Sequence, residues 1–329
     1  MSDWFERVEN DSSNVVYSRV RLSRNWDEYA FPSRLMDRES RELVVRLEQG
    51  IQGLGSLDGH RYESAFLSQL RDLDKEALKE RRILNSSIAQ RRSPTGLVIS
   101  DDESASLVLN GEDHIRMQFL APGLALRECW QRADKLDDYI NERFSYAFDD
   151  KYGYLTTYPT NMGTGMKASV VIHMPTLSTS RKFNELLGEM SRFGTTVRGV
   201  YGQGSENYGA LYEIYNQKTL GQSEQEIIDL VEKVALQLTG QENQVRKKAL
   251  ENHRLIREDE IYKSYGVLKY ARRLTMKDAM TFLSQIMAGA ADGILKMKEP
   301  CSVYGLMLGI QPANLLSQAE RPLSREELD

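Results

Sequence analysis

Cysteine is scarce in this sequence, and long apolar runs are missing. The chain of 329 residues has two cysteines, Cys129 and Cys301, too few for a disulfide framework or a cysteine-rich zinc site. No apolar run reaches the length needed to cross a bilayer, and the polar N-terminus lacks the apolar core of a signal peptide. We therefore expect a cytoplasmic protein with no membrane partner and no metal site of its own. Both cysteines are expected to be buried or half-buried.

A strong excess of either charge is also lacking. The net charge of −5 does not favour nucleic acid as the main ligand, although it is compatible with local basic patches. With 40% hydrophobic and 28% charged residues, the chain can bury a large core, which argues against disorder. Its length fits one large domain or two of ordinary size.

Strand and helix patterns follow one another in the first two thirds of the chain without regular alternation. We predict a short strand at 18–25, a helix at 37–54 and a second helix at about 63–82. Two apolar runs, GLVIS and SLVLN, flank an acidic turn and predict a hairpin. This mixture favours an α+β fold over a doubly wound one.

The pattern changes near Gly221. From 223 to 295 it is almost entirely helical, including a long and highly charged stretch. We therefore expect a domain boundary near residue 245, inside a long helix, which divides the chain into domains 1–245 and 246–329.

Two arginines share one face of the first predicted strand. In SRVRLSRN, Arg19 and Arg21 are two residues apart, so both guanidinium groups point to the same side. Two neighbouring like charges repel each other, and a polyanion would neutralise them. The alternative is a solvated edge strand, on which cations discourage pairing with other strands.

The segment NGEDHIRMQ adds a second group of charges. If it is a strand, Glu112, His114 and Arg116 share one face. Glu112 is then a candidate general base and Arg116 a candidate phosphate ligand. A surface ladder of ion pairs explains the same pattern, and His114 is equally compatible with a hydrogen-bonded structural role.

Two further segments combine glycine with a cation. In GTGMKASVVIHM, Lys167 and Ser169 share a strand face behind a glycine turn whose backbone N–H groups can approach an anion. In VRGVYGQGSE, Arg198 precedes a glycine-rich turn. Each turn by itself is compatible with a plain hairpin. The four charged segments together point to an anion-binding cleft.

These segments resemble the signature sequences of the phosphagen (guanidino) kinases. SRVRLSRN, NGEDHIRMQ, YPTNMGTGMKASVVIHMP and VRGVYGQGSE occur in the family's order, and the likeness runs from about residue 13 to the C-terminus. FLAPGLAL and YNQKTLGQSEQEIIDLVEKVALQL are most similar to the bacterial McsB-type protein-arginine kinases. The resemblance implies a large antiparallel sheet flanked by helices, like the core of glutamine synthetase, followed by a smaller helical domain.

The resemblance also implies an activity and its residues. It implies ATP with Mg²⁺ as cofactor, transfer of the γ-phosphoryl group to a guanidino nitrogen of protein arginine, and a homodimer. Glu112 matches the carboxylate that positions the guanidinium and accepts its proton. Gln203 stands at the position of the family's second catalytic residue. The implied nucleotide-binding residues are Ser18, Arg19, Arg21, Arg82, His114, Arg116, Lys167, Ser169, Arg198 and Gly199. The implied acceptor-binding residues are Tyr158, Asn161, Gly163 and Thr164.

Several positions depart from the family pattern. Tyr158 stands where the family has cysteine, Lys167 where it has arginine, and Gly111 and Gln203 where it has glutamate. Arg82 stands where the McsB branch has a histidine that helps to hold the nucleotide. Lysine keeps the charge but loses bidentate geometry, whereas Gln203 cannot accept a proton.

Three hypotheses follow. The first is an ATP-dependent protein-arginine kinase, served by an activator protein and a Clp-type protease system. The second is a pseudokinase that binds nucleotide and acts as a scaffold. The third is a kinase for a free guanidino compound, which the helical C-terminal region makes less favoured. The phosphoarginine-binding motif of the McsB branch would fall at Leu328-Asp329, where its recognition arginine is missing.

Overall fold

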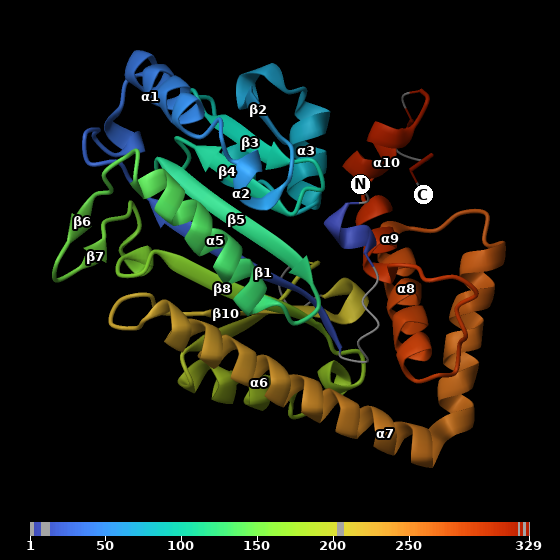
Figure 1. The fold of residues 1–329 in the computed structure, drawn as a ribbon. Helices are drawn as coiled ribbons and strands as arrows, with labels where there is room; N and C mark the ends of the chain where they lie inside the picture. The colour runs from blue at the N-terminus through green and yellow to red at the C-terminus, as the bar shows by residue number, and fades with distance from the viewer. Residues whose placement is uncertain (1–2, 8–13, 203–206, 322, 325–326, 329) are drawn as a thin grey trace.

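A large antiparallel sheet forms the centre of the molecule (Figure 1). The structure is a computed structural model that describes residues 3–7, 14–202, 207–321, 323–324 and 327–328. The sheet has eight strands in the order β2-β3-β4-β5-β1-β8-β10-β9, and neighbouring strands pair antiparallel. The expected α+β class with a helix-flanked antiparallel sheet is confirmed.

The elements have the following bounds. The strands of the sheet are β1 (Val15–Arg24), β2 (Tyr62–Phe66), β3 (Gly96–Ser100), β4 (Ala105–Leu109), β5 (Ile115–Pro122), β8 (Met166–His173), β9 (Thr195–Gly199) and β10 (Leu211–Asn216). A small hairpin consists of β6 (Phe148–Asp149) and β7 (Gly153–Tyr154). The helices are α1 (Asp37–Gly50), α2 (Gly55–Asp58), α3 (Asp72–Glu80), α4 (Ser86–Ala89), α5 (Leu126–Asn141), α6 (Phe183–Arg192), α7 (Glu224–Tyr270), α8 (Met276–Ala291), α9 (Val303–Gly309) and α10 (Pro312–Gln318).

One face of the sheet is apolar and covered by helices. Side chains alternate between the two faces of a strand, so Val20 and Leu22 of β1 lie on the same face as Ala168 of β8. This face packs against buried side chains of α1, α5, α6 and α7 in the main hydrophobic core. Burial of this apolar surface is the main force that holds the helices to the sheet.

Among the described residues, helices cover the opposite face only towards its two ends. At one end, Ile83 and Ile88, from α4 and the loop before it, pack against Leu97 and Val108 of the sheet. At the other end α8 and α9 cover the sheet, with Tyr304 of α9 packing 5.3 Å from the ring of Tyr17. The strands between these two clusters keep polar and charged side chains on this face.

The long helix α7 joins the two parts of the chain. Its N-terminus has a capping box, in which Ser223 and Glu226 each bind the other's backbone N–H. Its first half packs on the sheet, and its second half runs along α8 (Figure 1). The helix departs from helical backbone angles at His253, where φ is −139° and ψ is 36°.

Two expectations about local structure are wrong. Residues 63–66, the start of the helix expected at about 63–82, belong to the edge strand β2 (Tyr62–Phe66), and α3 begins only at Asp72. An edge strand has one neighbour and exposed side chains, so its polar sequence does not show the alternation of a buried strand. Cys129 is buried as expected, but Cys301 is exposed. In the described part of the chain, no helix has the length and apolar character that a membrane span requires.

Candidate functional site

Basic side chains from β1, β8 and β9 gather on the part of the sheet that the described helices leave uncovered. The strand register places Arg21 opposite Lys167 and Arg19 opposite Ser169. Arg198 of β9 lies opposite Glu213 of β10. Directly opposed residues share a face, so these side chains belong to one cluster, as the sequence predicted for the arginines.

Glu213 is the counter-ion of two of these arginines. Its carboxylate accepts hydrogen bonds from the Arg19 guanidinium and from Arg198, whose Nη2 is 2.7 Å from Oε2. Burial by itself would raise the pKa of Glu213, but the charges of Arg19 and Arg198 lower it to about 2. Glu213 therefore stays ionised and holds Arg19 and Arg198 in place.

Among the described residues, Arg21 has no such counter-ion. We find no hydrogen bond or ion pair of its guanidinium among the described residues. Burial, together with the nearby charges of Arg19 and Arg116, lowers its pKa to about 9. A partly buried cation among like charges is unfavourable until an anion joins it, so Arg21 could bind a phosphate oxygen.

A pocket of about 230 Å³ opens beside this cluster. It is lined by Tyr17, Arg19, Arg82, Arg198, Gly199, Val200 and Glu213. Arg82 has a left-handed backbone (φ 70°), and its guanidinium lies 4.6 Å from the centre of the Tyr201 ring and donates to the carbonyl oxygen of Val200.

Two arginines keep an unused donor near the cluster. The Nε atoms of Arg82 and Arg116 are buried and have no hydrogen-bond partner among the described residues. Buried donors without a partner are rare and call for an explanation. A ligand with several anionic oxygens would satisfy both atoms.

Lys167 and Ser169 occupy the same face with protein partners. The Lys167 ammonium donates to the carbonyl oxygen of Asn216 at 3.0 Å, and burial lowers its pKa, with a smaller effect from Arg21. Ser169 accepts a hydrogen bond from Nε of Arg19 at 3.2 Å. Ser169 therefore orients Arg19, and Lys167 adds charge without a bidentate fork.

Glu112 lies next to this cluster, in the loop before β5. Its Oε2 is 3.3 Å from Nη1 of Arg116. Its Oε1 accepts hydrogen bonds from Nδ2 of Asn85 at 2.9 Å and from the Ser87 hydroxyl at 2.7 Å. Burial by itself would raise the pKa of Glu112, but Arg116, Asn85 and Ser87 together lower it. The carboxylate is thus ionised, half-buried and in direct contact with the cationic cluster.

The loop that contains Tyr158 is bonded to the Glu112 loop. The Thr157 hydroxyl donates to the carbonyl oxygen of Glu112 at 2.7 Å, and the Thr157 N–H donates to Asp113 at 2.7 Å. Tyr158 follows directly and is 52% exposed. Its ring is therefore accessible to an acceptor that approaches Glu112 from solvent.

The glycine loop that follows is packed against the protein. Gly163 has φ 97°, and a Cβ there would lie 2.4 Å from the carbonyl oxygen of Thr219. The Thr164 N–H donates to that same oxygen. The expectation that backbone N–H groups of this loop cradle a phosphate gains no support from these contacts. Asn161 ends the short 3-10 helix η4 (Pro159–Asn161) just before the loop.

Arg24 holds this loop to the rest of the domain. Its guanidinium is buried, pairs with Asp137 of α5 at 2.6 Å, and donates to the carbonyl oxygen of Thr164 at 3.0 Å. It also lies 3.6 Å from the centre of the Tyr154 ring. Arg24 therefore fixes the glycine loop relative to β1.

Three expectations about site residues are wrong. Ser18 lies on the helix-covered face, where its hydroxyl binds the carbonyl oxygen of Gly123 and the N–H of Ala125. His114 is fully buried, and its two ring nitrogens bind the N–H of Trp26 and the carbonyl oxygen of Ala30. Both side chains are used within the protein, so neither is available to a nucleotide.

The third correction concerns the strand itself. Because β5 begins only at Ile115, Glu112, His114 and Arg116 do not share a strand face. The backbone turns at Asn110, which has φ 57°. Gln203 lies outside the described residues.

Sequence reasoning missed the partners that complete the site. Asn85, Ser87 and Glu213 are far in sequence from the residues they bind, so no local pattern reveals them. The sequence contains one indication that Glu213 has a buried partner: it is the single acid in the otherwise uncharged strand LYEIYN. A charge in a buried strand indicates a buried partner.

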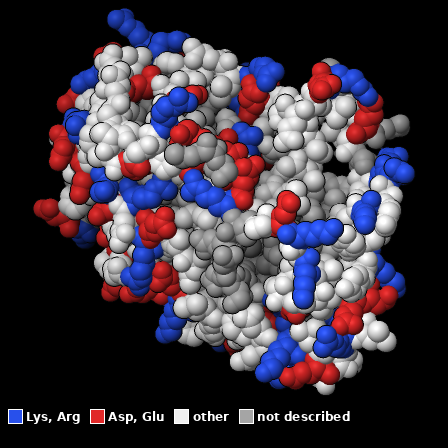
Figure 2. All heavy atoms as spheres, turned by 45° about the vertical axis from the view of Figure 1, so that its right-hand side comes forward, with Lys and Arg blue, Asp and Glu red and all other residues white. Residues whose placement is uncertain are grey.

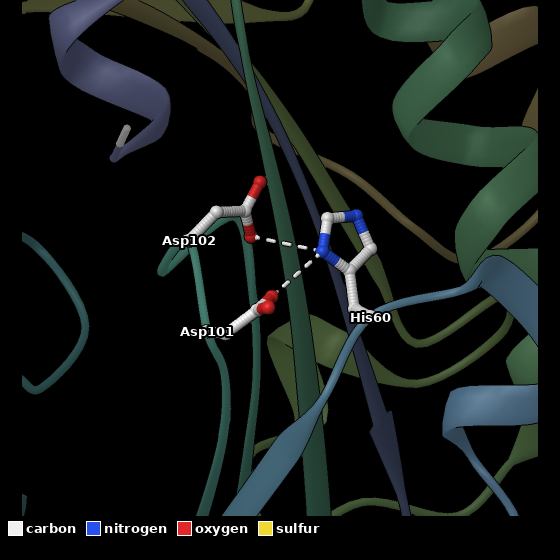
Figure 3. A group of neighbouring side chains, drawn as sticks. All are labelled: His60, Asp101 and Asp102. Atoms are coloured by element: carbon white, nitrogen blue, oxygen red, sulfur yellow. Dashed lines mark hydrogen bonds and ion pairs between the residues drawn. The ribbon is translucent and has the colours of Figure 1, made fainter. Parts of the chain in front are cut away.

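One group of potential metal ligands lies away from the basic residues of the site. Figure 3 shows His60, Asp101 and Asp102 around the β3–β4 turn, with Nδ1 of His60 3.0 Å from Asp101 and 3.5 Å from Asp102. The carboxylate of Asp102 already accepts hydrogen bonds from Ser100, Ser104 and Arg7. These bonds commit Asp102 to the turn, so the group does not offer a metal three free ligands.

Over the face in Figure 2, acidic and basic side chains are interspersed.

Comparison with known families assigns both parts of the chain. A family model described as ATP:guanido phosphotransferase, C-terminal catalytic domain, matches residues 48–245. A second model, described as Protein-arginine kinase McsB C-terminal domain, matches residues 255–329.

Two similar proteins cover nearly the whole chain. One is a protein-arginine kinase of Caldanaerobacter subterraneus subsp. tengcongensis, 36% identical over 97% of this chain and 97% of that protein. The other is a protein-arginine kinase of Halalkalibacterium halodurans, 37% identical over all of this chain and 92% of that protein.

Solved structures share the fold. The substrate-free duplicated taurocyamine kinase of Schistosoma mansoni superposes with a TM-score of 0.60 at 25% identity, over 71% of this chain and 34% of the longer duplicated one. A lombricine kinase superposes with a TM-score of 0.62 at 21% identity, over 76% of this chain and 72% of its own. With the basic face, the ionised carboxylate beside it and the two matching family models, the chain belongs to the ATP:guanido phosphotransferase family, among the bacterial protein-arginine kinases.

Proposed function

We propose that this protein transfers the γ-phosphoryl group of Mg-ATP to a guanidino nitrogen of arginine residues in proteins. The observation that carries the proposal is the contact between Arg116 and Glu112. It joins a cluster of cations suited to a triphosphate to an ionised carboxylate suited to a guanidinium. Membership of the protein-arginine kinases supports the choice of protein arginine as the acceptor.

The chemistry requires a base and a clamp. Arginine is protonated at neutral pH, so its guanidinium must lose a proton before a nitrogen can attack. Glu112 takes that proton, the nitrogen bonds to the γ-phosphorus, and the bond from that phosphorus to the bridging oxygen of ADP breaks. Arg19, Arg21, Arg116 and Arg198 hold the phosphate oxygens in line and stabilise the charge of the transition state.

Magnesium would enter with the nucleotide. The two carboxylates described on this face are Glu112, which binds Arg116, and Glu213, which binds Arg19 and Arg198. We propose that neither binds the metal, because Glu213 is paired with two arginines and the open position of Glu112 is kept for the acceptor guanidinium. We therefore propose that phosphate oxygens and water supply the ligands of Mg²⁺, an ion that keeps several waters when it binds substrate phosphates.

Finer aspects of the proposal rest on the family. We propose two domains, 1–245 and 246–329, a homodimer in the cytoplasm, and an activator protein and a Clp-type protease system as partners. We propose that Gln203, Asn161, Gly163 and Thr164 contact the acceptor, as the resemblance implies.

A pseudokinase is the less favoured alternative. The retained carboxylate Glu112 and the arginine cluster support catalysis. By the resemblance, the substitutions at Gly111, Tyr158 and Gln203 all concern the acceptor side, so we propose that they bear on which arginine is accepted rather than on whether ATP binds.

The test is phosphoryl transfer. The purified protein is incubated with Mg-ATP labelled at the γ-position and casein, beside the Glu112→Gln variant. Acid-labile label on arginine that vanishes in the variant supports the proposal. Nucleotide binding without label in the wild-type protein contradicts it and favours the pseudokinase.

A further inference from the structure

The base of the site is held by a short segment outside the signature sequences. Asn85 and Ser87 flank the start of α4, and both reach Oε1 of Glu112, at 2.9 Å and 2.7 Å. Asn85 also caps the helix, because its Oδ1 accepts the N–H of Ile88 at 2.8 Å. Ile88 is buried against the sheet, so the segment has a fixed place.

The hydrogen-bonding capacity of the carboxylate makes its two oxygens different. An ionised carboxylate has about four acceptor positions, two on each oxygen. Asn85 and Ser87 occupy both positions of Oε1, whereas Oε2 has one contact, the 3.3 Å bond from Arg116. Oε2 therefore keeps room for one more donor.

The unusual glycine before Glu112 belongs to the same arrangement. A Cβ at Gly111 would lie 3.1 Å from Cδ1 of Ile88 and 2.9 Å from Cγ1 of Val108. Both distances are shorter than ordinary contacts between carbon atoms. A side chain at Gly111 would need Ile88 or Val108 to shift, so the glycine fits the close packing of α4 beside the Glu112 loop.

We propose that Asn85 and Ser87 are positioning residues that bind Oε1 of Glu112, so that Oε2 alone receives the proton of the acceptor guanidinium. The inference rests on the proposed function for the identity of the acceptor. The two donors stabilise the ionised carboxylate before the reaction and orient its free oxygen. They touch neither substrate and act only through Glu112.

The test combines a titration with kinetics on the full-length protein. Ser87→Ala removes the hydroxyl at an exposed position, and Asn85→Asp keeps the helix cap but replaces the donor with a negative charge. Ser87→Thr restores a hydroxyl. Ser86→Ala is the matched control, because Ser86 is exposed on the same helix and is not bonded to Glu112. The Glu112 carboxyl is followed by ¹³C NMR as a function of pH, with Glu112→Gln to assign its signal.

We expect the Glu112 titration and the acid limb of the kcat profile to move to higher pH in Ser87→Ala and further in Asn85→Asp. In Ser87→Ala, kcat should fall about tenfold with KM for ATP unchanged. Ser87→Thr and Ser86→Ala should behave as wild type. An unmoved Glu112 titration in both variants would overturn the inference. Absence of transfer by the wild-type protein would overturn the proposed function instead, while the carboxyl titration still decides the role of Asn85 and Ser87.

Discussion

Most cations of the site lie on strands, with Arg82 in a turn, whereas the carboxylate beside them, Glu112, lies in a loop. Arg19, Arg21 and Arg198 have their places fixed by the ladder of the sheet. Glu112 and Tyr158 have no such ladder, and their loops are held by side chains from elsewhere, such as Asn85 and Thr157.

This difference explains where the chain departs from its family. A strand position is fixed by its neighbours on both sides, and at Lys167 the arginine of the family pattern is replaced by another cation. Loop positions are set by a few hydrogen bonds, so residues such as Gly111 and Tyr158 can change while the sheet stays intact. Nucleotide binding and acceptor binding should therefore respond separately to mutation.

The largest difference between the effect on phosphoryl transfer and the effect on nucleotide binding is expected for Glu112→Gln. Without a base, transfer to casein should fall about a thousandfold, within the usual range for general-base catalysis. The Kd for Mg-ATP, measured by calorimetry, should change less than about threefold, because the arginines are untouched. A parallel loss of both quantities would show that the two sides are not separable.

The next largest effect is expected at the junction of the two sides. Arg24→Met leaves Asp137 as an uncompensated buried charge and should reduce the free energy of unfolding by about 3 to 5 kcal/mol. Chemical denaturation measures it. The exposed pair of Arg254 and Glu258 provides the control, since Arg254→Met should cost less than about 0.5 kcal/mol. Equal effects would rule out a special role for Arg24.

A smaller effect should distinguish two arginines of the phosphate side. Arg21→Met should weaken Mg-ATP binding about thirtyfold, from the loss of charge-assisted hydrogen bonds of about 2 kcal/mol. Arg198→Met should weaken it less, because Arg198 is already paired with Glu213. Calorimetry on both variants checks the order. The reverse order would contradict the assignment of Arg21 as the free phosphate ligand.

The same residue predicts a pH dependence. The pKa of Arg21 is lowered to about 9 without nucleotide, and a bound phosphate favours the protonated form. As the pH rises through about 9, Arg21 without nucleotide loses its proton, and Mg-ATP must then bind a site that lacks this charge. The affinity for Mg-ATP should therefore fall by at most tenfold per pH unit. Arg21→Met should remove that dependence. A profile that persists in the variant would assign the titration to another group.

The smallest effect is expected for Tyr158→Cys. The exposed ring lies beside the acceptor loop and makes no contact with the arginines that we describe. We expect KM for casein to change a few-fold and the Kd for Mg-ATP to stay the same. Steady-state kinetics with varied casein provides the measurement, and Tyr152→Cys, at another exposed tyrosine, is a matched control.

Much of the sheet could be predicted, and the failures have clear causes. The hairpin of β3 and β4, strand β8 and helix α1 all follow from local apolar periodicity. Edge strand β2 could not be predicted because its polar side chains lack that periodicity. The prediction of Ser18 as a ligand was wrong because successive side chains of a strand point to opposite faces. Ser18 is next to Arg19 in β1, so its side chain lies on the opposite face from Arg19 and Arg21.

The sequence by itself determined that Arg19 and Arg21 share a face, because side-chain alternation on a strand is a local property. It also determined the family, because the signature segments occur in one order along the chain. Only the tertiary structure decided which charge remains without a partner and which oxygen of Glu112 stays free. Those outcomes depend on contacts with Glu213, Asn85 and Ser87, which come from distant parts of the chain. Burial then strengthens the electrostatic effect of these contacts, because the ionised form of a group removed from water is stabilised mainly by its nearest partners.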